Sequence, residues 1–301
     1  MAVPAISHPV PIGAKVAAYV ALMKPRIIEL LLVTTVPTMV VAHQGVPSLW
    51  LIVATVLGGT LAAGGAHAVN MYVDRDIDAV MERTQGRPLV TGVVSPRSAL
   101  VFAVTIEVIA FVLLWTLVNP LSAALALAAC LFYVCVYTLW LKRSSTQNIV
   151  IGGAAGAVPV LIGWSAVTNT VSISAVVLFG VIFFWTPPHF WALAIKYKDD
   201  YSRADVPMLP SVASHRSTTN QILVYTLLVW LCTLVFGATA EMGLLYWVAA
   251  VVLGAVFTAL AVDVRQTETP GRAMRLFTFS ITYVTLLFGA MAADVIIRHG
   301  W

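Results

Sequence analysis

The chain has 301 residues, of which 60% are hydrophobic and only 10% are charged. Soluble domains carry about 25% charged residues, so this composition excludes a soluble globular protein. The net charge of +4 comes from basic residues spread over several segments, which favours a membrane protein without a nucleic-acid partner. The three cysteines lie inside apolar stretches and lack the spacing of a redox pair or a zinc site.

The amino-terminal segment 1–26 lacks the basic, apolar and cleavage regions of a signal peptide. It also lacks the Arg-rich and Ser-rich composition of a transit peptide. We therefore expect this segment to be cytoplasmic and the protein to reside in a bacterial cytoplasmic membrane.

Apolar stretches follow one another along the rest of the chain, and each is long enough to cross about 30 Å of hydrocarbon as a helix. Nine spans are predicted, at 27–44, 49–69, 99–118, 121–141, 149–167, 173–193, 221–240, 243–263 and 274–297. They predict an all-α integral membrane protein with one helical bundle, forming a single domain at 27–297 and followed by a short external tail at 298–301.

The basic residues are distributed unevenly between the two sides of these spans. Of the 17 Lys and Arg residues, only Arg298 lies on the side opposite the amino terminus. Because cytoplasmic loops are enriched in Lys and Arg, we predict that the amino terminus and the connections after even-numbered spans are cytoplasmic. The two longest of these connections, 70–97 and 194–220, hold more than half of the 13 acidic residues.

The connection after the second span carries Asn70, Asp74 and Asp78, which a continuing helix would align on one face. Two carboxylates at this spacing repel each other unless a cation lies between them, and hard oxygen ligands favour Mg²⁺, which also binds substrate phosphates. Arg83 and Arg87 follow at the same interval, and guanidinium groups pair with phosphate oxygens. We interpret the segment as a prenyl diphosphate site beside an apolar bundle; the alternative is a solvated, salt-bridged loop.

Four separated stretches resemble the UbiA superfamily of intramembrane aromatic prenyltransferases, and in particular its protohaem IX farnesyltransferase (haem O synthase) branch. They are KPRIIELLLVTT at 24–35, NMYVDRDIDAVMERTQGRPL at 70–89, YTLWLKRSSTQNIVIGGAAGAVP at 137–159 and TPPHFWALAIKYKDDYSRADVPMLP at 186–210. They occur in the expected order, so the match is far more specific than a lone pair of aspartates.

The resemblance implies a nine-helix bundle around a central cavity that the two acidic loops cap. It also implies that Mg²⁺ assists the loss of diphosphate. By position, Asn70, Asp74 and Asp78 match the first metal and diphosphate motif. Asp200 matches the surviving carboxylate of the second motif, so the implied metal ligands are Asp74, Asp78 and Asp200.

Lys196 departs from the general superfamily pattern, which has an aspartate at this position, and is typical of the haem branch. A lysine here could contact the diphosphate directly, which leaves the number of Mg²⁺ ions open. Asp199 and Asp205 remain alternative carboxylates for the second motif.

The resemblance implies an enzyme that transfers a farnesyl group from farnesyl diphosphate to a vinyl group of haem B. Water then adds to give haem O for the assembly of haem–copper oxidases. We expect basic side chains to stabilise the departing diphosphate beside Mg²⁺; they are Arg83, Arg87, Lys142, Arg143 and Lys196. Haem A synthase and terminal oxidase assembly factors are the expected protein partners, within the lipid bilayer.

Histidine is a frequent protein ligand of haem iron, and the chain has six histidines. His189 is the favoured haem ligand and His67 is the second candidate, because both lie near the predicted site. For each of them, helix packing is the competing interpretation.

Three other functions are consistent with parts of the sequence. The nearest is a quinone-pathway aromatic prenyltransferase, and the others are a haem or solute transporter and a haem-binding structural subunit. A transporter predicts charges at mid-membrane, whereas the charges here gather at one face with metal-ligand spacing. A haem-binding subunit would not need Asp74 and Asp78, so an enzyme is favoured.

Overall fold

The computed structural model describes residues 11–300, with the backbone alone for some positions between 26 and 32. Residues 1–10 of the predicted amino-terminal segment and Trp301 of the predicted tail lie outside the described residues. Every element of the described chain is helical, which confirms the predicted all-α class.

Eight helical segments in the described chain are long and apolar enough to cross a membrane. They are α3 (Leu49–Val73), α5 (Pro96–Leu117), the continuous run of α6 (Pro120–Leu131), η2 (Phe132–Leu141) and α7 (Lys142–Ser144), then α8 (Asn148–Thr168), α9 (Ile173–Lys196), α12 (His215–Thr239), α13 (Leu244–Gln266) and α14 (Pro270–His299). They coincide with the second to ninth predicted spans and indicate a multi-pass membrane protein.

The first predicted span, 27–44, coincides with α2 (Pro25–His43). The apolar part of α2 found among the described residues, Val33–His43, is shorter than a bilayer requires. A bundle of nine spans therefore stays a prediction.

Polar residues placed just before the helices fix where several of them begin. Asn119 Oδ1 accepts a hydrogen bond from the Ser122 N–H at 2.8 Å, and Ser95 Oγ accepts one from the Ser98 N–H at 3.1 Å. Each of these caps is followed by a proline at the start of the helix, where the missing N–H would have no helical partner.

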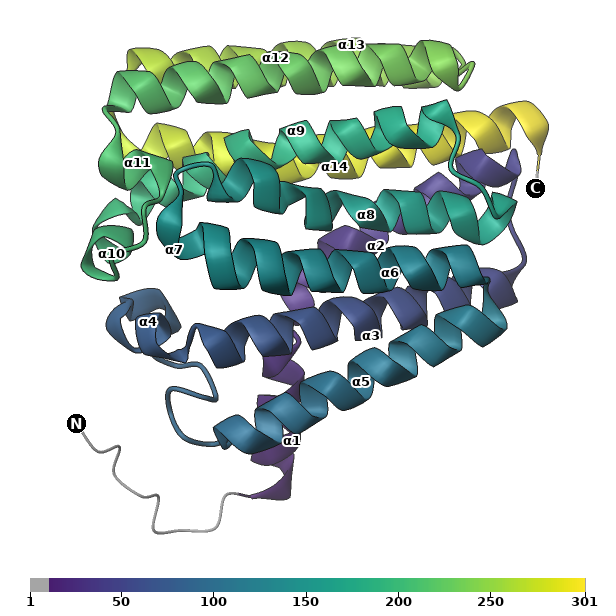
Figure 1. Ribbon diagram of the computed structural model, residues 1–301. Helices are drawn as coiled ribbons and strands as arrows, with labels where there is room; N and C mark the ends of the chain where they lie inside the picture. The colour runs from purple at the N-terminus through teal and green to yellow at the C-terminus, as the bar shows by residue number, and fades with distance from the viewer. Residues whose placement is uncertain (1–10, 301) are drawn as a thin grey trace.

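The long helices stack in layers, with α12 and α13 at one side of the bundle and α3 and α5 at the other (Figure 1). Between them, α9 packs against α8, α12 and α14. The short helices α4 (Arg75–Val80), α10 (Lys198–Arg203) and α11 (Leu209–Val212) gather with α7 at one end of the bundle (Figure 1). The two long loops therefore meet at this end.

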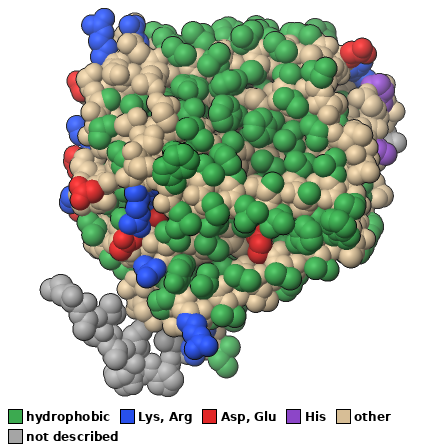
Figure 2. All heavy atoms as spheres, viewed as in Figure 1, with side chains coloured by type: hydrophobic (Ala, Val, Ile, Leu, Met, Phe, Trp, Pro, Cys, Tyr) green, Lys and Arg blue, Asp and Glu red, His purple; other side chains and the backbone are tan. Residues whose placement is uncertain are grey.

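Charged side chains gather along this same end, whereas hydrophobic side chains cover most of the remaining visible face (Figure 2). This distribution agrees with the one-sided charge predicted from the sequence. Which side of the membrane this end faces stays a prediction.

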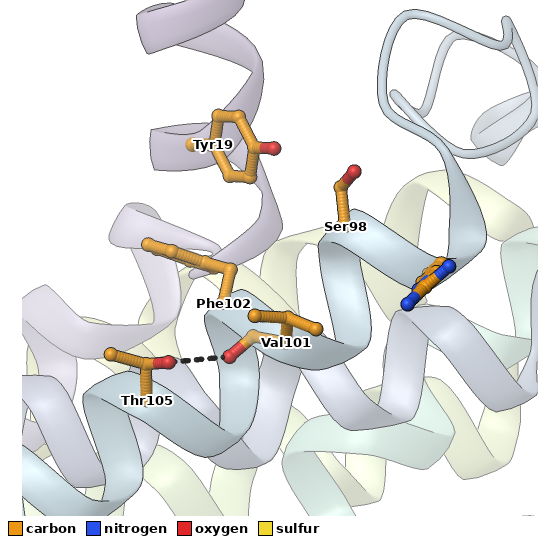
Figure 3. Close-up of a pocket in the computed structure, with 6 residues that line it drawn as sticks. Tyr19, Ser98, Val101, Phe102 and Thr105 are labelled. Carbon is orange, nitrogen blue, oxygen red and sulfur yellow. Dashed lines mark hydrogen bonds between the residues drawn. The ribbon is translucent and has the colours of Figure 1, made fainter.

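The helix α1 (Ile12–Leu22) was not predicted from the sequence and lies at the edge of the bundle, transverse to α3 and α5 (Figure 1). The ring of Tyr19 on α1 lies 5.0 Å from the ring of Phe102 on α5, beside a shallow hollow (Figure 3). None of the predicted site residues lines this hollow. The hollow is therefore not the central cavity predicted from the sequence.

Candidate functional site

Asn70, Asp74 and Asp78 lie together on the buried face of a nearly continuous helix. Asp74 separates α3 from α4, yet the N–H groups of Asp74 and Asp78 still donate to carbonyls four residues earlier, at 2.9 and 2.8 Å. The three residues are at most 2% exposed, whereas the side chain of Asp76 is 62% exposed. The structure thus places the three predicted residues on one face, and the solvated-loop alternative describes only the face of Asp76.

Asn70 stands at the centre of a network that joins three segments of the chain. Its Nδ2 donates to Asp74 Oδ2 at 2.8 Å and to Thr138 Oγ1 at 3.1 Å. Lys24 Nζ donates to Asn70 Oδ1 at 2.7 Å, and Lys142 Nζ forms an ion pair with Asp74 Oδ2. These contacts hold the start of α2, the end of α3 and the end of η2 around one amide.

Each aspartate of this segment has a basic partner. Arg87 Nη1 lies 2.5 Å from Asp78 Oδ2. Arg143 donates two hydrogen bonds to Asp76, at 2.6 and 2.7 Å, and its Nη2 lies 3.9 Å from Asp74 Oδ1. The predicted residues Arg87, Lys142 and Arg143 therefore surround the acidic face.

Lys24 and Asp76 have shifted pKa values. Burial, and then the charges of Arg87 and Lys142, lower the pKa of Lys24 to about 7. Hydrogen bonds from Arg143 lower the pKa of Asp76 to about 2, so that carboxylate stays ionised at neutral pH. Because Lys24 titrates near neutrality, an anion that binds beside it would favour its charged form.

The second loop meets the first through ion pairs. Arg203 pairs with the buried carboxylate of Asp200, and its Nη2 also lies 3.1 Å from Glu82 Oε1 of the first loop. The alternative carboxylates, Asp199 and Asp205, are exposed. Of the three acidic candidates in this loop, Asp200 is thus the one that the fold buries.

Arg83 of the first loop and Lys196 at the end of α9 both lie beside the ring of Tyr197. Arg83 Cζ is 5.6 Å and Lys196 Nζ is 5.4 Å from the centre of this ring. The interval from Arg83 to Arg87 is not helical, because α4 ends at Val80 and a 3₁₀ turn, η1 (Glu82–Thr84), follows. The two arginines therefore have different partners, Tyr197 for Arg83 and Asp78 for Arg87.

The donors present at the acidic face fit a hard divalent cation. Among the described residues, no three His, Cys, Asp or Glu side chains form a group that could hold a metal by themselves. Asp74 Oδ1, however, is buried and makes no hydrogen bond. Mg²⁺ often binds through one or two carboxylates and completes its shell with water and substrate phosphates, so Asp74 and Asp78 suit it.

The two candidate haem ligands occupy different surroundings. His189 on α9 is stacked against the ring of Trp185 and hydrogen-bonded through Nδ1 to Ser280 at 2.6 Å. His67 lies about one turn before Asn70 on α3, and neither of its buried ring nitrogens has a hydrogen bond. The ring of Tyr133 meets it edge-on, with ring centres 5.5 Å apart.

Lys24 and Thr138 both contact Asn70 but were not predicted as site residues from the sequence. Lys24 could have been suspected, because a lysine directly before the proline that starts α2 stands close to the membrane edge. Nothing in the sequence pattern pointed to Thr138, because it lies on the π-helix η2, whose side chains do not follow the period of an α-helix.

Comparisons with known proteins identify the family of this chain. The model of the UbiA prenyltransferase family matches residues 31–286. A protoheme IX farnesyltransferase of Streptomyces coelicolor is 52% identical over 96% of this chain and 93% of its own. One of Parafrankia sp. is 55% identical over 93% of this chain and 90% of its own.

Solved structures share the fold at low sequence identity. That of a digeranylgeranylglyceryl phosphate synthase has a TM-score of 0.77 at 14% identity and covers 94% of this chain and 99% of its own. A UbiA homologue from Archaeoglobus fulgidus bound to GPP and Mg²⁺ has a TM-score of 0.63 at 16% identity, over 91% of this chain and 99% of its own. By the family match and the full-length relatives, the chain belongs to the UbiA prenyltransferase family and is a prenyltransferase.

Proposed function

We propose that this enzyme transfers the farnesyl group of farnesyl diphosphate to a vinyl group of haem B, after which water adds to give haem O. The observation that carries the proposal is the buried face of Asn70, Asp74 and Asp78, surrounded by cations at one end of an apolar bundle. The choice of substrates is supported by the relatives named protoheme IX farnesyltransferase, which are more than half identical to this chain.

Mg²⁺ would be held by Asp74 and Asp78. Asp200, the third predicted ligand, pairs with Arg203 and does not form a three-carboxylate group with them among the described residues. When bound, it supplies positive charge that stabilises the departing diphosphate. The A. fulgidus structure with GPP and Mg²⁺ supports this combination of metal and prenyl diphosphate in the fold.

Basic side chains of this chain would neutralise the charge that develops on the diphosphate as its bond to farnesyl C1 breaks. Lys142 and Arg87 already contact the two aspartates, and Lys24 reaches Asn70 beside them. Arg143 would act from the rim of the same face, whereas Arg83 and Lys196 would act from the side of the second loop. Such preorganised charges require no reorganisation during the reaction.

The chemistry at the carbon atoms needs no protein nucleophile. The electrons of the haem vinyl group form the new bond to farnesyl C1 while diphosphate leaves with the electrons of the broken C–O bond. A water oxygen then bonds to the resulting carbocation and releases one proton. The apolar helices would keep water from the allylic carbon until the acceptor is in place.

Haem B would be held through its iron by His189, with His67 as the second candidate. We infer that the acidic end of the bundle faces the cytoplasm of a bacterium and that the enzyme acts in its plasma membrane. The product would then pass within the bilayer to haem A synthase or to assembly factors of a terminal oxidase.

The test is to incubate the purified protein in detergent with haem B, farnesyl diphosphate and Mg²⁺ and to measure the pigments by mass. Asp74→Asn is the test variant, and Asp76→Asn is its matched control because Asp76 lies on the exposed face two residues away. We expect a product heavier by one farnesyl group and one hydroxyl group in the wild type and in Asp76→Asn. This product should be lost in Asp74→Asn and when EDTA replaces Mg²⁺.

Other outcomes identify other functions. If hydroxybenzoate is prenylated and haem B is not, the enzyme belongs to quinone synthesis. If no acceptor reacts while haem binds, a haem carrier replaces the proposal. Full activity of Asp74→Asn would show that the acidic face takes no part in the reaction.

A further inference from the structure

The imidazole of His189 is held between two aromatic rings. It stacks on Trp185, with ring centres 4.2 Å apart and planes 19° apart, and on Phe277 of α14 at 4.6 Å and 26°. Two rings stacked this closely must occupy opposite faces of the imidazole. The plane of the ring is therefore fixed. Only a half-turn about the Cβ–Cγ bond, which turns the ring over within this plane, would remain possible.

A bond to Ser280 on α14 selects one of these two orientations. His189 Nδ1 lies 2.6 Å from Ser280 Oγ, and Ser280 Oγ also donates to the Phe277 carbonyl at 2.6 Å. A hydroxyl has one hydrogen to donate. Because that hydrogen goes to Phe277, Ser280 Oγ accepts the second bond and His189 Nδ1 carries the hydrogen.

The same serine also fixes the position of the helix that carries His189. Trp185 Nε1 donates to the Ser280 carbonyl at 2.9 Å, so the main chain and the side chain of Ser280 each receive one bond from α9. Ser280 is completely buried, and no water competes for its hydroxyl. The two bonds set α9 against α14 at the level of His189.

This arrangement leaves the other ring nitrogen free to bind a ligand. A neutral imidazole carries one N–H, so Nε2 of His189 presents its lone pair. Nε2 makes no hydrogen bond with any described residue. Histidines that bind metals commonly donate their second ring nitrogen to a neighbouring group, which fixes the tautomer and the direction of the lone pair.

We propose that Ser280 is a positioning residue, which holds His189 in the Nδ1–H tautomer so that Nε2 can ligate the iron of the haem acceptor. The inference rests on the proposed function, since it assumes that haem B is the acceptor. Ligation would fix the porphyrin relative to the farnesyl carbon, and such alignment of reactants lowers the barrier of a two-substrate reaction.

The test is a titration of the purified full-length protein in detergent with ferric haem B, followed by the Soret band and by the reduction potential. His189→Ala should lose the spectrum of a histidine-ligated haem. Ser280→Ala should keep the fold but bind haem about 10- to 100-fold more weakly, as is typical when a group behind a metal ligand is removed. Ser280→Thr keeps the hydroxyl and should restore both the spectrum and the affinity.

Two further variants separate positioning from stability. Ser280→Cys fills the site with a slightly larger thiol that accepts hydrogen bonds poorly, so it tests the inference even if Ser280→Ala unfolds. Tyr283→Phe is the matched control, because it removes another buried hydroxyl of α14, which lies 2.8 Å from Thr233 Oγ1. It should lower thermal stability without changing the haem spectrum.

The inference and the proposed function fail in different ways. If the wild type forms haem O while Ser280→Cys and Ser280→Ala bind haem with the wild-type spectrum and affinity, Ser280 has no positioning role. A histidine-ligated spectrum in His189→Ala would also overturn the inference. If the wild type neither binds nor prenylates haem B, the proposed acceptor is wrong and the inference fails with it.

Discussion

Lys24 and Asn70 meet through a 2.7 Å hydrogen bond from Nζ to Oδ1, although 46 positions separate them in the sequence. Lys24 adopts a left-handed backbone conformation, with φ of 54°, directly before Pro25. This conformation costs a non-glycine residue about 1 kcal/mol, so the surrounding contacts must hold it. The bond joins the start of α2 to the acidic face and makes Lys24 part of the proposed diphosphate site.

The pKa of about 7 at Lys24 predicts that diphosphate binding depends on pH. Above pH 7 the amine of the free protein is largely neutral, and a bound anion would draw a proton back onto it. Affinity for a non-reactive farnesyl diphosphate analogue should therefore fall as pH rises, by up to about tenfold per unit. Titration calorimetry in buffers of different ionisation enthalpy would measure the proton uptake.

Lys24→Met should bind the analogue about 10- to 100-fold more weakly near neutral pH, because one charge-assisted hydrogen bond is lost. Its affinity should also vary less with pH than that of the wild type. Lys15→Met, at an exposed position of α1, is the matched control. An unchanged pH slope in Lys24→Met would show that another group takes up the proton.

Thr138 should orient Asn70 without contacting substrate. Thr138→Val keeps the shape of the side chain but removes the acceptor of the 3.1 Å bond from Asn70 Nδ2. We expect kcat/KM to fall about 3- to 10-fold, the effect of one neutral hydrogen bond, while Thr138→Ser stays near the wild type. Equal activity of the valine and serine variants would remove Thr138 from the site.

The sequence predicted the acidic face because its spacing is local. Asn70, Asp74 and Asp78 follow one another at intervals of one helical turn, and the i to i+4 hydrogen bonds continue across the break at Asp74. The contacts of Lys24 and Thr138 could not be predicted in the same way. They join segments far apart in the chain, and their geometry depends on how α2 and η2 pack against α3.

The four-residue interval between Arg83 and Arg87 shows the limit of spacing arguments. An interval of four residues places side chains together only while the helix continues, and α4 ends at Val80. Arg83 therefore turns towards Tyr197 of the second loop, and Arg87 pairs with Asp78. The number of membrane spans was also hard to predict, because hydropathy alone does not show how far α2 crosses the bilayer.

Gly152 is predicted to be a packing position that supports the site. A Cβ atom at Gly152 would lie 2.3 Å from Tyr137 Cδ2, and Tyr137 precedes Thr138 on η2. Gly152→Ala should therefore cost about 1 to 3 kcal/mol of stability and lower activity, because Tyr137 has to move. Gly156→Ala, one turn further along α8 where nothing lies within 4 Å, should be tolerated.

Thermal unfolding in detergent, together with the haem O assay at a temperature where both variants are folded, would compare the two glycines. Wild-type stability in Gly152→Ala would mean that η2 adapts without cost. Loss of activity in Gly156→Ala would instead favour a substrate passage along this face of α8.

Asp294 should stabilise the end of the bundle opposite to the site and take no part in catalysis. It is 2% exposed, and its carboxylate accepts hydrogen bonds from the N–H groups of Gly243 at 2.6 Å and Tyr246 at 3.3 Å. Because Gly243 has no side chain to cap α13, a carboxylate from α14 satisfies these donors and complements the positive end of the helix dipole.

Asp294→Ala should therefore lower the free energy of unfolding by about 1 to 3 kcal/mol, because one buried and one partly buried donor lose their acceptor. Asp294→Asn keeps an acceptor oxygen but loses the charge, so its stability should be intermediate. Arg298→Ala should have a smaller effect, since Arg298 Nη1 is 3.7 Å from the carboxylate and partly exposed. Thermal unfolding would rank the variants, and haem O formation by folded protein should be equal in all of them; a selective loss of activity in Asp294→Ala would give this carboxylate a role beyond capping.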